Sequence, residues 1–170
     1  MRYINSWAVA VPYEVKSIKQ ALMLLGSGRL RKWRSLIAAA CMCKDKPTEL
    51  LLLCLVRARF DELIGPMACG ETHESECFLT GMLSGVDALL DRPLADVLDE
   101  VSVSDSVKGA LLGRQSPLRP VHQLAVACEQ GDWDQVSRLA ARMEIPEKRV
   151  SEAYRRASHW ADQILSLDIA

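Results

Sequence analysis

The chain has 170 residues, of which 49% are hydrophobic and 25% charged, and a formal net charge of −1. This composition excludes a disordered or collagen-like protein, and the balanced charge gives no overall attraction to nucleic acid or to an anionic membrane. The longest apolar runs, residues 36–43 and 50–56, are much shorter than the roughly 20 residues that span a bilayer. We therefore expect a cytoplasmic protein with no membrane segment.

Helical periodicity across most of the chain predicts an all-α protein, a compact bundle of about eight or nine helices. We expect a first helix from Ser17 to Gly26 and a second from about Gly28 to Cys43. A third begins at Pro47, contains the apolar run 50–56 and ends at Gly65–Pro66. Because that run is apolar on all sides, this helix is the best candidate for the core.

The fourth helix is expected to be capped by Thr72 and to run to about Leu90. Its buried stripe is predicted to consist of Phe78, Met82, Val86 and Leu89. The pair Ser84–Gly85 stands in the middle of this helix. Glycine costs a helix interior about 1 kcal/mol relative to alanine, and serine competes for its own backbone, so helix propensity does not explain the pair.

The second half of the chain predicts five more helices with short connections. Their ends are marked by Pro93, Ser104, Gly113, Ser116–Pro117, Gly131 and Pro146. The helix after Gly131 is predicted to bury a stripe of Trp133, Val136, Leu139 and Ala140. The last helix, which Pro146 opens, is the longest of the five.

Cysteine and histidine are the residue types most able to bind a metal here. The six cysteines, at positions 41, 43, 54, 69, 77 and 128, lack the spacing of a zinc module, and we interpret them as reduced core residues. None of the three histidines precedes an aspartate, as a bimetal hydrolase of the HD kind requires. His73 and Cys77 could face one ion, with Glu74 and Glu76 nearby, although the segment also suits a polar helix start.

One basic cluster stands out near the start of the second predicted helix. It contains Arg29, Arg31, Lys32 and Arg34, interleaved with Trp33. Such a turn can bind phosphate or an acidic partner surface, and it is also typical of a solvated helix face. We treat these four basic residues as a candidate interaction patch.

Several motifs give the chain a family resemblance. Residues 2–33 carry an Arg-Tyr-x-Asn-Ser run, a Ser-Ile-x-Gln-Ala-Leu helix start and a Leu-Leu-Gly-x-x-x-Leu-x-x-Trp continuation. These motifs resemble the HDOD domain, a catalytically degenerate relative of HD-type phosphohydrolases. Residues 78–98, 129–140 and 153–162 look most like the HDOD half of bacterial proteins that join an EAL cyclic di-GMP phosphodiesterase-type domain to an HDOD domain.

The resemblance implies one HDOD-like domain over residues 1–170, with an HD-like core at 1–115 and a C-terminal helical subdomain at 116–170. HDOD domains begin with one or more helices ahead of the Arg-Tyr-x-Asn-Ser run, whereas this chain starts directly before it. Without those helices an apolar face is left to be covered, so we expect a protein partner, a homodimer or poor solubility.

The resemblance also implies where a metal site has been lost. In active HD-type relatives the fourth helix reads Gly-Leu-Leu-His-Asp-Ile-Gly, and Ser84 and Gly85 stand in the His-Asp place here. An earlier ligand histidine would fall near Arg57 or Ala58. We therefore predict a degenerate former metal site at Ser84, Gly85 and Ala58, with no metal, no cofactor and no catalytic residue.

The resulting functional expectation is a non-enzymatic signal-transduction and protein-interaction module of bacterial regulation, linked to cyclic di-GMP. Its expected partner is an EAL-type or other regulatory protein, and no nucleic acid or membrane partner is expected. Two alternatives stay open. One is a metal-dependent phosphohydrolase with an atypical ligand set around His73 and Cys77, and the other is a nucleic-acid-binding module that uses the basic segment 29–34.

Overall fold

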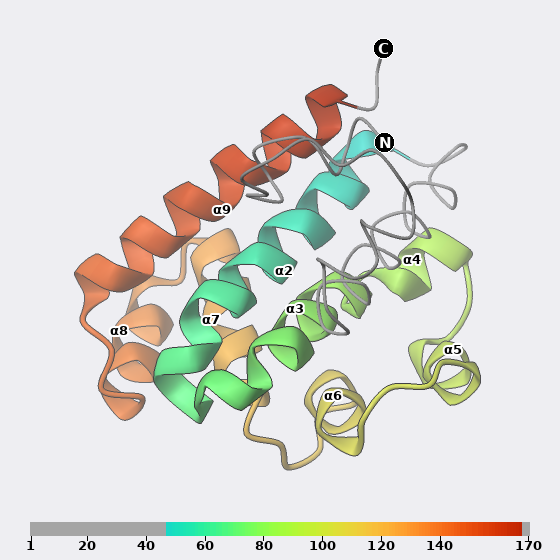
Figure 1. Cartoon of the computed structure of the whole chain (residues 1–170), viewed down its shortest axis with the longest axis horizontal. Coiled ribbons are helices and arrows are strands. Elements are labelled where there is room, and N and C mark those ends of the chain that lie inside the picture. The colour runs from blue at the N-terminus through green and yellow to red at the C-terminus, as the bar shows by residue number, and fades with distance from the viewer. Residues whose placement is uncertain (1–46, 168–170) are drawn as a thin grey trace, which may run out of the picture.

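The computed structural model describes residues 47–167 (Figure 1). These residues form eight α-helices and one short 3-10 helix, and they contain no strand. The elements are α2 (Thr48–Cys69), η3 (Glu71–His73), α3 (Glu74–Leu83), α4 (Val86–Leu90), α5 (Leu94–Glu100), α6 (Asp105–Leu111), α7 (Arg119–Gln130), α8 (Trp133–Arg142) and α9 (Glu147–Leu167). The predicted all-α class is confirmed. The first two predicted helices lie outside the described residues.

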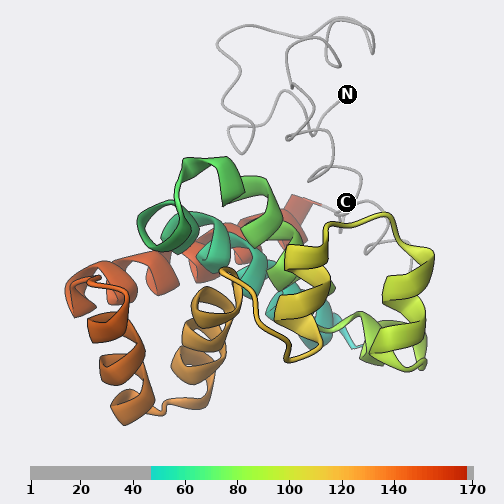
Figure 2. The same cartoon turned by 90° about the horizontal axis from the view of Figure 1, so that it is seen from below.

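Helix α2 lies at the centre of the bundle, with α3 on one side and α9 on the other (Figure 1). Turned by 90°, the bundle shows α7 and α8 side by side at one end and α5 and α6 at the other (Figure 2). The apolar run that begins α2 is packed from several directions, with Leu51, Cys54 and Leu55 buried. A helix that is apolar all round needs this central position.

The core has two main parts, and both are built on α2. The first half of α2 packs with α3, α4 and the end of α9, through Leu51, Leu55, Ala58, Phe78, Met82, Leu89, Ala161 and Ile164. The second half packs with α7, α8 and the start of α9, through Phe60, Ile64, Val121, Leu124, Val136, Leu139, Val150 and Ala153. The predicted stripe of Phe78, Met82, Val86 and Leu89 is thus confirmed as buried.

Several predicted helix ends are also confirmed. The Ser104 hydroxyl accepts a hydrogen bond from the Val107 backbone N–H at 3.4 Å and caps α6. Gly131 ends α7 with φ = 69°, a left-handed conformation that glycine adopts without strain. None of the described helices combines the length and the hydrophobicity that crossing a membrane requires.

The predicted end of the third helix at Gly65–Pro66 is wrong, because α2 continues to Cys69. Pro66 lies in the last turn and removes only one backbone hydrogen bond, to the carbonyl of Glu62. The last turn is also held by packing, since Gly65 lies so close to α3 that a Cβ at this position would overlap Cys77. The helix ends at Gly70, where φ is 91°.

The predicted fourth helix differs from the structure at its start and in its middle. Thr72 is not its cap, because residues Glu71–His73 form a 3-10 turn and α3 begins at Glu74. Ser84 and Gly85 do not lie inside a helix but separate α3 from α4. Both the hydroxyl and the backbone N–H of Ser84 donate to the carbonyl of Gly81, at 2.7 and 3.3 Å, which tightens and ends α3.

The predicted burial of Trp133 is wrong. This residue was expected on the buried stripe of α8 but is 66% exposed, whereas Val136, Leu139 and Ala140 are buried as predicted. Trp133 is the first residue of α8, so it lies at the edge of the helix contact. The predicted boundary between residues 115 and 116 stays a prediction.

Candidate functional site

The three residues of the predicted former metal site lie where α2 meets α3 and α4. Ala58 is fully buried on α2, opposite Gly81 of α3. A Cβ on Gly81 would overlap the backbone at Arg57 and Ala58, so the two helices touch backbone to backbone here. A Cβ on Gly85 would lie 2.7 Å from the Cys54 Sγ. Ala58 and Gly85 therefore provide close packing, and that a metal was once bound here stays a prediction.

Ser84 belongs to a cluster of polar side chains centred on Arg57. The Arg57 Nη1 donates to the Ser84 Oγ at 3.1 Å. Its Nε and Nη2 donate to the two carboxylate oxygens of Glu129 at 2.7 and 2.9 Å. This two-pronged geometry is the strong form of an arginine–carboxylate pair. One guanidinium thus joins α2, the end of α3 and α7.

Asp61 lies one helical turn after Arg57 on α2 and is fully buried. Its Oδ2 is hydrogen-bonded to the His122 Nδ1 of α7 at 2.9 Å, while its Oδ1 has no hydrogen-bond partner among the described residues. Burial raises the pKa of Asp61 above its ordinary value of 3.8, and the neighbouring His122 and Arg57 counteract this rise only in part. Arg57, Asp61, Ser84, His122 and Glu129 are called the polar cluster below.

The polar cluster was not predicted as a unit. Ser84 was predicted as a site residue, and the side chain of Arg57, the neighbour of Ala58, donates a hydrogen bond to it. His122, Asp61 and Glu129 were not assigned a role. One usable signal was the sequence Arg-Ala-Arg-Phe-Asp-Glu at 57–62, which places charged residues inside an otherwise apolar helix.

The alternative metal site is not assembled around His73 and Cys77. The His73 Nδ1 lies 2.7 Å from the Glu76 Oε2 near the surface. Cys77 is 1% exposed, and its Sγ packs against Gly65 and lies 3.8 Å from the Cys69 Sγ. Burial raises the pKa of the Cys77 thiol, which disfavours the thiolate that binds metals. Residues 47–167 contain no group of three or more His, Cys, Asp or Glu side chains placed to hold a metal ion.

The described cysteines are Cys54, Cys69, Cys77 and Cys128, and all four are free thiols. Three of them are buried, in agreement with their interpretation as core residues. Cys41 and Cys43, together with the predicted patch of Arg29, Arg31, Lys32 and Arg34, lie outside the described residues. The patch therefore stays a prediction.

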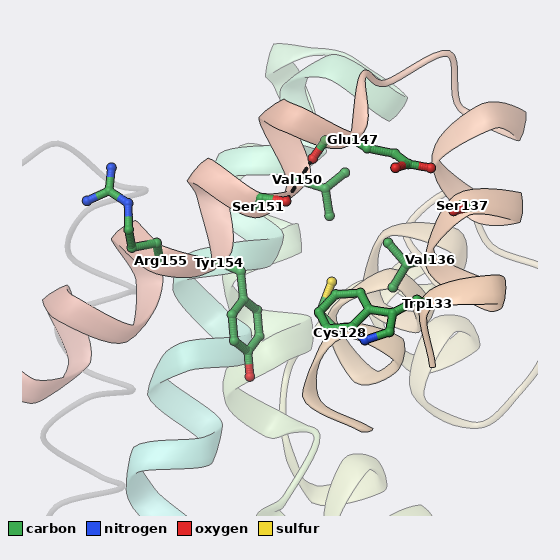
Figure 3. A pocket seen from close by; sticks show the side chains of 9 residues that line it. All are labelled: Cys128, Trp133, Val136, Ser137, Glu147, Val150, Ser151, Tyr154 and Arg155. Atoms are coloured by element: carbon green, nitrogen blue, oxygen red, sulfur yellow. Dashed lines mark hydrogen bonds between the residues drawn. The ribbon is translucent and has the colours of Figure 1, made fainter. Parts of the chain in front are cut away.

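A surface pocket of about 250 Å³ lies between α7, α8 and α9 (Figure 3). It is lined by Cys128, Trp133, Val136, Ser137, Glu147, Val150, Ser151, Tyr154 and Arg155. Val136, Val150 and Tyr154 form its apolar inner part, and Trp133 stands exposed on the α8 wall. Glu147 and Arg155 bring opposite charges to its rim. Sequence patterns missed this pocket because Trp133 was placed in the core.

Asp61→Asn should change the pH dependence of stability. Because the folded-state pKa of Asp61 is raised, its contribution to stability is complete below pH 3.8 and is lost as pH rises through the raised value. Asparagine stays neutral, so the variant should unfold at a higher temperature than the wild type at pH 8. The difference should shrink as pH falls toward 4, as thermal unfolding followed by circular dichroism can show. A difference that is constant with pH would contradict the raised pKa.

The described residues thus form an all-α bundle with a polar cluster around the buried Asp61 and an open surface pocket, and sequence comparison gives the relatives. The chain is 31% identical over 164 residues to the Vibrio cholerae protein named cyclic di-GMP phosphodiesterase CdgJ, a match that covers 96% of this chain and 38% of that protein. It is 26% identical over 168 residues to the Bacillus subtilis protein YuxH, covering 97% of this chain and 40% of that protein. No family model and no solved structure matches the chain.

One of these relatives, CdgJ, is named for cyclic di-GMP, the signalling system that the motifs led us to expect. This relative also corrects one expectation. The chain was predicted not to be an enzyme, because the HD-type metal ligands are replaced, but its relative CdgJ is named as a phosphodiesterase. The loss of the HD-type ligands at one site was thus not sufficient ground for predicting that the chain is not an enzyme. The chain spans about two fifths of the length of both relatives.

Proposed function

We propose that this chain is an HDOD-type helical module that acts in bacterial cyclic di-GMP signalling by controlling a phosphodiesterase through protein contact. The observation that carries the proposal is the match to CdgJ, which extends over 96% of this chain but only 38% of that protein. The helical bundle is therefore the shared part. The motifs of residues 2–33 support its assignment as an HDOD domain, and the expected cytoplasmic location belongs to the same proposal.

The arrangement of the described residues supports a contact role. Tryptophan, tyrosine and arginine dominate the binding energy of protein interfaces, and Trp133, Tyr154 and Arg155 line the same open pocket. The polar cluster fixes α7, which forms part of that pocket, to α2 and α3. A rigid support of this kind keeps a contact surface in one geometry and lowers the entropy lost on binding.

A second candidate is hydrolysis of cyclic di-GMP by this chain itself. The specific observation in its favour is the buried pair of Asp61 and His122, since a carboxylate that orients a histidine is a common arrangement for a general base. The two candidates differ in a direct assay. If the purified chain alone converts cyclic di-GMP into the linear dinucleotide, the catalytic reading is favoured over control by contact.

An in-frame deletion of the codons for residues 47–167 tests the proposed function in the host cell. Loss of a module that promotes phosphodiesterase activity should raise intracellular cyclic di-GMP several-fold, measured by mass spectrometry of cell extracts. A wild-type copy should return the concentration to its original level, and a copy with Trp133→Ala should do so only in part. A cyclic di-GMP concentration unaffected by the deletion would count against the proposal.

A further inference from the structure

The outer face of α9 carries three exposed residues at intervals of four, Glu147, Ser151 and Arg155. Residues spaced in this way lie along one side of a helix. All three line the pocket between α8 and α9 (Figure 3). The α9 stripe, as these three residues are called below, thus borders this pocket.

Opposite charges stand at the two ends of the α9 stripe. Glu147 and Arg155 are eight residues apart, which corresponds to about 12 Å along a helix axis. Neither side chain forms an ion pair with another residue of the described part of the chain, and Figure 3 shows them pointing to different sides of the pocket. Ser151, at the centre of the stripe, has a short side chain, and its hydroxyl donates to the Glu147 carbonyl at 3.1 Å.

This charge pattern is complementary to itself. A two-fold rotation about an axis through Ser151 places Glu147 of one copy against Arg155 of a second copy, and Arg155 of the first against Glu147 of the second. Two-fold dimers require such a surface, in which each contact occurs twice. We propose that the α9 stripe is the centre of a homodimer interface in which the α9 helices of two copies pack antiparallel.

The same face supplies apolar surface for this contact. The inner pocket is formed by Val136, Val150 and Tyr154, and Trp133 stands 66% exposed on the α8 wall. Only Met67 and Val101 are also exposed among the large hydrophobic side chains of residues 47–167, and neither lines the pocket. Interface centres are enriched in aromatic residues and arginine. Trp133 is expected to lose solvent exposure when the second copy docks.

Two other occupants are less well matched. A different protein would need the same charges at the same spacing in reverse order, whereas a second copy has them by symmetry. A purine nucleotide could stack on Trp133, but its phosphates would meet the Glu147 carboxylate as well as Arg155. The proposed dimer uses the pocket residues that also support the contact role, so its test is read from the oligomeric state alone, whether or not the chain acts in cyclic di-GMP signalling.

A charge exchange tests the dimer through the dissociation constant measured by sedimentation velocity of the full chain. Glu147→Arg replaces two attractive pairs of the dimer by two repulsive ones and should weaken dimerisation at least about tenfold, and so should Arg155→Glu. The double variant Glu147→Arg/Arg155→Glu restores opposite charges across the interface. Its dissociation constant should return to within about threefold of the wild-type value.

Controls separate the interface from general effects. Trp133→Ala should weaken the dimer, and Arg114→Glu, in the loop between α6 and α7, should leave its dissociation constant unchanged. Circular dichroism of each variant verifies that the monomer remains folded. A wild-type chain that is monomeric at every concentration overturns the proposal, and so does a double variant as weak as the single ones. In that case a retained effect of the chain on cyclic di-GMP would leave the proposed function intact.

Discussion

Gly81→Ala is expected to lower the free energy of unfolding by about 3 kcal/mol, because the added methyl group would overlap the backbone of α2 at Arg57 and Ala58. A flexible side chain could move away, but a helix backbone cannot do so without opening the contact between α2 and α3. For a chain of this size the loss corresponds to a fall in melting temperature of about 10 °C. Thermal and denaturant unfolding both measure it.

Gly109→Ala is the matched control for this prediction. Gly109 is also buried in a helix, α6, but a Cβ there would meet the Gln115 carbonyl oxygen at 3.2 Å, which is tight without being an overlap. The higher helix propensity of alanine, about 1 kcal/mol, works against that cost. Gly109→Ala should therefore change stability far less. Equal losses at the two glycines would mean that the close contact of α2 and α3 does not limit the fold.

His122→Leu is the second substitution with a large expected effect. It leaves the fully buried carboxyl group of Asp61 without its one hydrogen-bond partner in the described structure. Leaving a buried polar group without its hydrogen-bond partner typically costs about 1–3 kcal/mol, and more when the group is charged. The loss should be greater at pH 8 than at pH 5, because a protonated Asp61 is easier to bury than an ionised one. Urea unfolding of the wild type and the variant at pH 8 and pH 5 measures the loss of unfolding free energy at each pH.

The double variant Asp61→Leu/His122→Leu shows whether that loss comes from the stranded carboxyl group. With both polar groups replaced by apolar ones of similar size, much of the stability should return. A double-mutant cycle with Asp61→Leu alone gives the coupling energy. If the two single losses simply add, the pair is not coupled and the high cost of His122→Leu has another cause.

The helix pattern could be read from the sequence wherever a local signal determines a helix end. Ser104 and Gly131 are such signals, since a serine cap and a left-handed glycine act within one turn of the chain. Pro66 and the Ser84–Gly85 pair misled for the opposite reason. Whether a helix continues through these residues depends on how α2 packs against the segment that follows it. Helix α2 continues past Pro66, where Gly65 packs against Cys77, and α3 ends before Gly85, which packs against Cys54.

The candidate site was less accessible to sequence reasoning. The resemblance to HDOD domains drew attention to Ser84, but the groups that surround it come from distant positions. Arg57 and Glu129 are 72 residues apart in the chain, and Asp61 and His122 are 61 apart. Hydrophobic periodicity along a helix does not predict contacts between residues so far apart in the chain. The exposure of Trp133 was missed for a similar reason, because a helix pattern shows which residues share a face but not where the neighbouring helix ends.

The central position of α2 has a consequence for protein synthesis. Its partner α3 follows after Gly70 and the three residues of η3, so this contact can form as soon as both helices have left the ribosome. Helix α9, which covers another side of α2, begins only at Glu147. At a synthesis rate of roughly 5–20 residues per second, the apolar surface of α2 stays without its contact to α9 for several seconds. The growing chain therefore passes through a stage in which it is open to aggregation and to binding by chaperones.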